Sequence, residues 1–142
     1  SVNITLGNSN NVNGASTEYI CYAFSGKQGY SKFGEYTGNG NANGTFVFLG
    51  FKPAFLMCKR TDDASEWSMF DNKRNTFNVV NHHVYADLPN AEGDDDDLDF
   101  TANGFKFRRD AGNTNGSGAT YIYAAFAEAP FVNSNGVPCN AR

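Results

Sequence analysis

Asn113-Thr-Asn-Gly-Ser-Gly-Ala-Thr-Tyr-Ile-Tyr-Ala-Ala-Phe126 decides how this sequence is interpreted, because a second version of it stands near the start of the chain. The earlier version is Asn11-Val-Asn-Gly-Ala-Ser-Thr-Glu-Tyr-Ile-Cys-Tyr-Ala-Phe24. A shift of 102 positions aligns seven identical residues without a gap: Asn11 with Asn113, Asn13 with Asn115, Gly14 with Gly116, Tyr19 with Tyr121, Ile20 with Ile122, Ala23 with Ala125 and Phe24 with Phe126. This agreement indicates an internal repeat.

Each version has the pattern of a turn that leads into a strand. The Asn-x-Asn-Gly head is typical of turns, and the aromatic and β-branched residues that follow favour a strand. In the later version, one face of the strand carries Tyr121, Tyr123 and Ala125, and the other carries Ile122, Ala124 and Phe126. Neither face is polar, so we expect this strand to lie deep between two layers.

The spacing of the repeat is that of a domain, because it is much longer than the repeat unit of a solenoid. We therefore predict a β-sandwich module over residues 25–130, followed by a C-terminal tail over residues 131–142. Residues 1–24 are predicted to be a strand equivalent to the closing strand of a preceding module, so that the chain is the end piece of a longer array. The alternative is one pseudo-symmetric domain in which the two similar strands lie side by side.

The rest of the chain predicts an all-β protein. Nineteen Asn and fifteen Gly residues among 142 favour many tight turns, and no helical periodicity of useful length is present. Nine or ten short strands alternate with turn signals, which is typical of an antiparallel two-layer β-sandwich. The strand over residues 30–37 is expected at a sheet edge, and the one over residues 54–60 in a sheet centre. Residues 105–109 are expected to alternate between core and solvent.

Composition excludes several classes of function. The net charge of -4 argues against a nucleic-acid-binding protein, and no apolar stretch is long enough for membrane insertion. The three cysteines lack CxxC spacing and form a poor disulfide framework, which favours assembly in a reducing cytosol. The glycine-rich segment 38–44 lacks the Gly-Lys-Ser/Thr and the helix of a phosphate-binding loop.

Two clusters of titratable residues are candidates for catalytic or metal sites. His82 and His83 are adjacent in a long β segment expected over residues 77–88, so their side chains should point to opposite faces, and no nucleophile signature accompanies them. The acidic run of Asp94, Asp95, Asp96 and Asp97 has the oxygen ligands of a weak calcium site but lacks the spacing of a calcium-binding loop. An exposed acidic loop is the simpler interpretation. We predict no enzyme activity and no cofactor other than a possible calcium ion.

Several motifs together resemble a repeat module found near the ends of large proteins of tailed bacteriophages, notably marine ones. The matching segments are Tyr36-Thr-Gly-Asn-Gly40, Leu49-Gly-Phe-Lys-Pro-Ala54, Lys59-Arg-Thr-Asp62, Trp67 with Met69 and Asp71, Asn103-Gly-Phe-Lys106, and Gly118-Ala-Thr-Tyr-Ile-Tyr-Ala-Ala-Phe-Ala-Glu-Ala-Pro130. The most specific are Gly-Phe-Lys-Pro and Ala-Phe-Ala-Glu-Ala-Pro. The likeness covers residues 19–130, and the histidine pair and the acidic run depart from it.

The resemblance implies a virion component, assembled in the host cytoplasm and displayed on the virion surface. Its fold would be of jelly-roll or concanavalin-like type, in a tail fibre or appendage that touches host-surface glycan. Its partners would be other virion proteins and further copies of itself, with a homotrimer as one possibility, because fibres are often trimeric and an unpaired strand invites exchange.

Glycan contacts are expected from loop Asn and Asp residues together with an aromatic ring. The candidate ligand-binding residues are Tyr36, Asn39, Asn41, Asp62 and Trp67. Trp67 has a competing interpretation as a core residue, because a lone Trp in an alternating strand is more often buried. Three other functions stay open: a capsid decoration or head-fibre protein, a polysaccharide depolymerase domain, and a secreted eukaryotic lectin.

Overall fold

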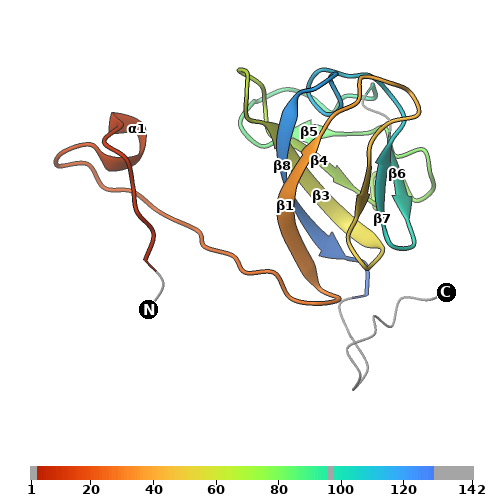
Figure 1. The fold of residues 1–142 in the computed structure, drawn as a ribbon, viewed down its shortest axis with the longest axis horizontal. Coiled ribbons are helices and arrows are strands. Elements are labelled where there is room, and N and C mark those ends of the chain that lie inside the picture. The colour runs from red at the N-terminus through yellow and green to blue at the C-terminus, as the bar shows by residue number, and fades with distance from the viewer. Residues whose placement is uncertain (1–2, 96–97, 130–142) are drawn as a thin grey trace.

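Two antiparallel sheets face each other across an aromatic core in the computed structural model, which describes residues 3–95 and 98–129 (Figure 1). The predicted all-β, two-layer antiparallel sandwich is confirmed. The elements are α1 (Asn10–Asn13), β1 (Ser31–Thr37), β2 (Phe46–Phe48), β3 (Pro53–Arg60), β4 (Ser68–Asp71), β5 (Val84–Tyr85), β6 (Leu98–Thr101), β7 (Gly104–Phe107) and β8 (Thr120–Ala127).

The larger sheet has five strands in the order β1-β8-β3-β4-β5. As the sequence predicts, β1 is an edge strand and β3 lies in the interior of the sheet. β8 pairs with β1 on one side and with β3 on the other, which uses the hydrogen-bonding groups on both of its edges. β8, which is the strand of the later repeat copy, therefore lies in the interior of this sheet.

The smaller sheet has three strands in the order β2-β7-β6. β6 and β7 form a hairpin in which Thr101 pairs with Gly104. In β7 the rings of Phe105 and Phe107 are buried while Lys106 is partly exposed. The predicted alternation of this strand is confirmed, and its two phenylalanines supply the smaller sheet's part of the core.

Aromatic rings fill the space between the sheets. Tyr36 stacks on Tyr121 with 4.9 Å between ring centroids and 9° between planes. Phe107 lies 5.3 Å from the Tyr36 ring, and Phe105 lies 5.6 Å from the Tyr123 ring. Rings of this size bury a large apolar area each, and their contacts add directional preference to that burial.

One buried amide holds the loops at the end of this core. The Asn115 Nδ2 group donates to the carbonyl oxygens of Arg109 (2.8 Å) and Asn41 (3.0 Å) and to Asn39 Oδ1 (3.1 Å). Its Oδ1 accepts from the Asn39 N–H at 3.1 Å. Because Gly38 packs on the same turn, a Cβ at that position would lie only 2.3 Å from the carbonyl oxygen of Gly116. The loop over residues 38–44 is therefore clamped to the turn before β8.

Residues 19–24 form no strand, because no neighbouring strand pairs with them in the described part of the chain. Their role as the closing strand of a preceding module stays a prediction. The structure corrects other predictions about strands. The long β segment expected over residues 77–88 shrinks to β5, and eight strands are described in place of nine or ten. β8 is covered on one face only: Tyr121 and Tyr123 are buried, whereas Ile122 on the opposite face is 39% exposed. The predicted tail over residues 131–142 lies outside the described residues.

None of the helices described in residues 3–95 and 98–129 has the length and apolar character needed to cross a membrane.

We expect the Asn115→Ala variant to lose about 2–4 kcal/mol of unfolding free energy, because the groups that bind this amide are partly buried and would lose their partner. Urea denaturation followed by tryptophan fluorescence measures the change. The matched control is Asn43→Ala: Asn43 is exposed and joins the loop through its main chain. A control loss as large as that of Asn115→Ala would contradict the assigned role of the buried amide.

Candidate functional site

An apolar row crosses the outer face of the five-stranded sheet. Phe33 on β1 lies opposite Ala124 on β8, and Ala124 lies opposite Met57 on β3. Met57 in turn lies opposite Met69 on β4, which pairs with Val84 on β5. Directly opposite residues share a face of the sheet, so the row spans all five strands. All five side chains are half-buried, and no second layer covers them in the described structure.

Phe33, Ala124 and Met57 of this row form the floor of an open groove of about 860 Å³. Ala124 has the smallest side chain of the row and lies between Phe33 and Met57, which leaves room between these two larger side chains. The Phe33 and Phe126 rings meet edge to face at 5.8 Å, and Phe24 stacks on Phe33 at the same distance. The groove is lined by Tyr22, Phe24, Phe33, Gly34, Glu35, Phe55, Met57, Trp67, Ile122, Tyr123, Ala124 and Phe126. We call these residues the outer groove.

In the row of residues next to this floor, a charged side chain stands on each of the two strands that flank β8. Glu35 lies opposite Ile122, and Ile122 lies opposite Lys59. Glu35 is exposed, whereas the Lys59 Nζ donates to the carbonyl oxygen of Ser65. Glu35 is therefore the acceptor that a ligand lying in the outer groove would meet first. The site combines flat aromatic surfaces with one carboxylate at the rim.

Of the five residues that the sequence analysis selected for ligand binding, only Trp67 lines the outer groove. Its expected alternative role as a core residue is wrong, because the ring is half-buried on the outer face. Tyr36 belongs to the core: it is 7% exposed, and its hydroxyl donates to the carbonyl oxygen of Thr114 at 2.7 Å.

The other three selected residues have polar partners within the chain. Asn39 Oδ1 accepts from the Asn41 N–H at 3.1 Å, and Asn41 Oδ1 accepts from the Asn43 N–H at 2.8 Å. These side chains shape the loop over residues 38–44. Asp62 binds the Arg60 guanidinium at 2.6 Å, and this hydrogen bond holds the pKa of the Asp62 carboxyl below its ordinary value. The structure does not bring the five residues together into one site.

The other aromatic residues of the outer groove, notably Phe33, Phe55 and Phe126, were not among the residues predicted to bind a ligand. The signal was present, since Ile122, Ala124 and Phe126 were recognised as one face of a strand. Periodicity shows that such a face is apolar, but it does not show what covers that face.

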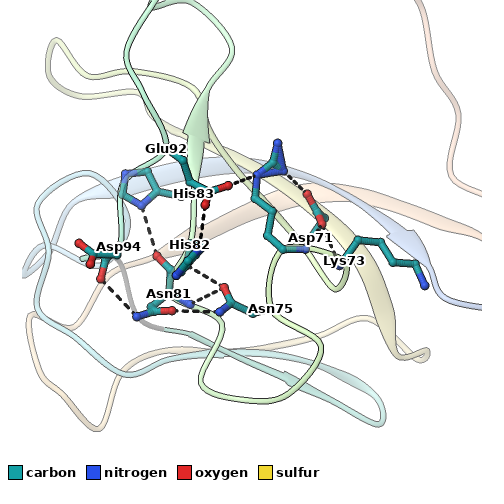
Figure 2. Close-up of polar contacts among 9 residues, drawn as sticks. Asp71, Lys73, Asn75, Asn81, His82, His83, Glu92 and Asp94 are labelled. Carbon is teal, nitrogen blue, oxygen red and sulfur yellow. Dashed lines mark hydrogen bonds and ion pairs between the residues drawn. The ribbon is translucent and has the colours of Figure 1, made fainter.

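The two histidines have different surroundings, as Figure 2 shows. The side chain of His82 is 41% exposed, and its Nδ1 lies 2.7 Å from Glu92 Oε1. His83 is buried, with its ring 5.9 Å from Phe70 and 5.0 Å from Tyr85. The prediction that the two rings point apart is confirmed.

Glu92 joins His82 to a second carboxylate through Arg74 (Figure 2). The Arg74 Nε lies 2.8 Å from Glu92 Oε2, and its NH1 group pairs with Asp71. Partial burial acts to raise the pKa of Asp71. The backbone N–H groups of Arg74 and Lys73, together with the Arg74 guanidinium, outweigh that effect and lower the pKa below its ordinary value of 3.8. The network therefore ties the loop after β4 to the segment that contains Glu92.

The acidic run gives no cation site that can be assembled from the described residues. Residues 3–95 and 98–129 contain no group of three or more His, Cys, Asp or Glu side chains placed to hold a metal. The Asp94 and Asp95 carbonyl oxygens accept from Asn81 and Arg109. Asp96 and Asp97 lie outside the described residues, so the calcium site stays a prediction.

Comparison with known proteins places the chain in a family. A family model described as "Domain of unknown function (DUF7483)" matches residues 1–130. The chain therefore belongs to this family. The search of curated proteins and the search of solved structures each found no match.

We expect Asp71→Asn to lose about 1–2 kcal/mol of unfolding free energy at pH 7, because the charge-assisted bonds from Arg74 and the two backbone N–H groups are weakened. A depressed folded-state pKa contributes stability that is present above the unfolded value and is lost as pH falls through the folded value. The difference between wild type and variant should therefore narrow as the pH falls below 3.8. Urea titrations at pH 7, 5 and 3 measure it, with exposed Asp110→Asn as control. A gap at pH 3 that is as large as the gap at pH 7 would contradict the assignment.

Proposed function

We propose that this protein is a non-enzymatic structural and adhesion module of a bacteriophage virion, carried in a tail fibre or appendage. The motifs around Gly50-Phe-Lys-Pro53 and in segment 118–130 support this assignment through their resemblance to virion repeat modules. A stiff β-sandwich suits such a role, because it tolerates loop variation and displays a contact surface on a rigid support. The module would be assembled in the host cytoplasm and displayed on the virion surface.

The observation that carries the adhesive role is the outer groove with Trp67 in its wall. Flat aromatic rings pack against the apolar face of a pyranose, while Glu35 offers a polar group for sugar hydroxyls. The groove is open, so it admits an internal segment of a polymer as well as its end. We therefore assign it a host-surface glycan as ligand.

Binding is favoured over cleavage by the carboxylates available there. Two-carboxylate glycoside hydrolysis needs a second acidic side chain about 5–9.5 Å from the first. Glu35 is the one acidic residue among the described residues that line the groove. This composition supports a lectin-like contact rather than a polysaccharide depolymerase.

A second candidate, a capsid decoration or head-fibre protein, is favoured by the apolar row itself. The row of Phe33, Ala124, Met57, Met69 and Val84 offers dispersion contacts and few hydrogen bonds. Exposed apolar surfaces of this kind commonly pack against another protein. In that case the groove would seat on a neighbouring virion protein or on a further copy in a homo-oligomer.

Glycan binding gives the test. On an array of bacterial surface glycans, followed by titration of the best ligand, we expect Trp67→Ala to weaken binding at least about tenfold, or about 1.4 kcal/mol. The control is Phe77→Ala, which removes an 84% exposed ring that does not line the groove. Far-UV circular dichroism checks that both variants fold.

The outcomes separate the two candidates. Glycan binding that is unchanged by Trp67→Ala would remove the outer groove as the adhesive site. A wild-type chain that binds no glycan but is located by immunogold labelling on the capsid shell would favour the decoration protein instead.

A further inference from the structure

Residues 7–24, here called the N-terminal arm, repeat the local structure of the turn before β8. The Tyr19 hydroxyl accepts from the Gly14 N–H at 2.8 Å and donates to the Asn10 carbonyl oxygen. The Tyr121 hydroxyl accepts from the Gly116 N–H at 2.8 Å and donates to the Gly112 carbonyl oxygen at 2.6 Å. The positions of these residues differ by 102, the same shift that aligns the two sequences.

Four further hydrogen bonds agree under the same shift. The arm has Val12 N to Ser9 O, Asn13 N to Ser9 O, Thr17 N to Gly14 O, and Asn13 Nδ2 to Gly7 O. The turn before β8 has Thr114 N to Ala111 O, Asn115 N to Ala111 O, Ala119 N to Gly116 O, and Asn115 Nδ2 to Arg109 O. Even the positive φ recurs, at 60° for Ser16 and 72° for Gly118. The turn of the arm is thus already formed.

The two copies differ in what surrounds them. Tyr121 is fully buried in the sandwich, whereas Tyr19 is 42% exposed, and Ile20 and Tyr22 are 82% and 79% exposed. Figure 1 shows the arm extending away from the two sheets. Its residues 19–24 carry apolar side chains on both faces and no strand pairing in the described structure. Such a segment has the side chains of a central strand without the neighbouring strands that a central strand requires.

We propose that the arm is a preformed eighth strand for a second module of this same fold. In that module, residues 19–24 would lie between the strands equivalent to β1 and β3, as β8 does here. Asn13 would bind the loop equivalent to residues 39–45, as Asn115 does here. Strand addition supplies main-chain hydrogen bonds along both edges, and a preformed turn lowers the ordering cost of binding.

Two sequence differences between the arm and β8 predict what kind of side chains the module that binds the arm can have. Cys21 takes the position of Tyr123, and Tyr22 takes the position of Ala124. Here Tyr123 lies opposite Gly34, where an added Cβ would be 3.0 Å from the Tyr123 hydroxyl. With the smaller Cys21 at the position of Tyr123, the partner module has space for a side chain at the position of Gly34. Tyr22 would also fill the hollow that Ala124 leaves in the outer groove.

The first test uses the full chain and releases β8 from its position between β1 and β3. Because β8 pairs on both edges, Ile122→Pro removes a hydrogen-bond donor from its middle and should release it. The arm of a second copy should then enter, which places Cys21 against Cys58, the residue opposite Tyr123. In a Cys139→Ser background, oxidised glutathione should convert the chain to dimers joined by a Cys21–Cys58 disulfide, identified by mass spectrometry of the linked peptides.

The control adds Ile20→Pro, which disables the arm in the same way and should reduce the disulfide-linked dimer at least about tenfold. Absence of the Cys21–Cys58 link in the Ile122→Pro chain, whether that chain is folded or not, would overturn the proposal. An equal yield with Ile20→Pro present would overturn it too, because the link would then form without strand insertion.

The second test needs no exchange between copies. Tyr123→Cys together with Ala124→Tyr gives β8 the arm's own sequence from residue 121 to residue 126. In that background Gly34→Ala should raise the thermal midpoint by about 2–5 °C, whereas in the wild-type chain it should lower the midpoint by a similar amount. A midpoint shift in the same direction in both backgrounds, or a double variant that does not fold, would contradict the predicted match between the arm and its partner module. Neither test involves glycan, so their outcome is separate from that of the proposed function.

Discussion

The hydroxyl of Tyr121 fixes the turn from which β8, an interior strand of the larger sheet, begins. It binds Gly112 and Gly116 on that turn, while the Tyr121 ring stacks on Tyr36 in the core. Burial raises the pKa of this phenol, which therefore stays a neutral donor and acceptor over the ordinary pH range. One side chain thus links the local geometry of the turn to the packing of the sandwich. β1 and β3 can pair with β8 only when that strand leaves the turn in the correct register.

The constraint has a consequence for the outer face of the sheet. Because the large rings of β8 point inward, its other face carries Ile122, Ala124 and Phe126, and the smaller sheet covers only the inner one. Antiparallel sheets commonly expose one face, but that face is usually polar. Here it is apolar and hollowed at Ala124. This contrast is the reason that we propose the outer face, and not the loop residues first chosen from the sequence, as the contact surface.

The sequence predicted features that depend on neighbouring residues in the chain, and it failed where the answer depends on distant ones. Alternation located β7, and continuous apolar character located β3 and β8 in the sheet interior. Tyr36 was selected for ligand binding although it lies in the core, and Trp67 kept two interpretations, since nothing local distinguishes a ring that faces the second sheet from one that faces solvent. Asn39 looked free for a ligand because its partner Asn115 lies far away in the sequence.

The same distinction explains the state of the N-terminal arm. The hydrogen bonds that form its turn join residues fewer than ten positions apart, so this turn can form without a second module. A strand is different, because its hydrogen bonds and its buried faces come from other parts of a protein. The arm therefore has the hydrogen bonds of the turn, which join nearby residues, and lacks the strand pairing, which needs distant ones. The exposed Ile20 and Tyr22 side chains follow directly from this difference, and so does the inference that another module of the same fold supplies the missing strands.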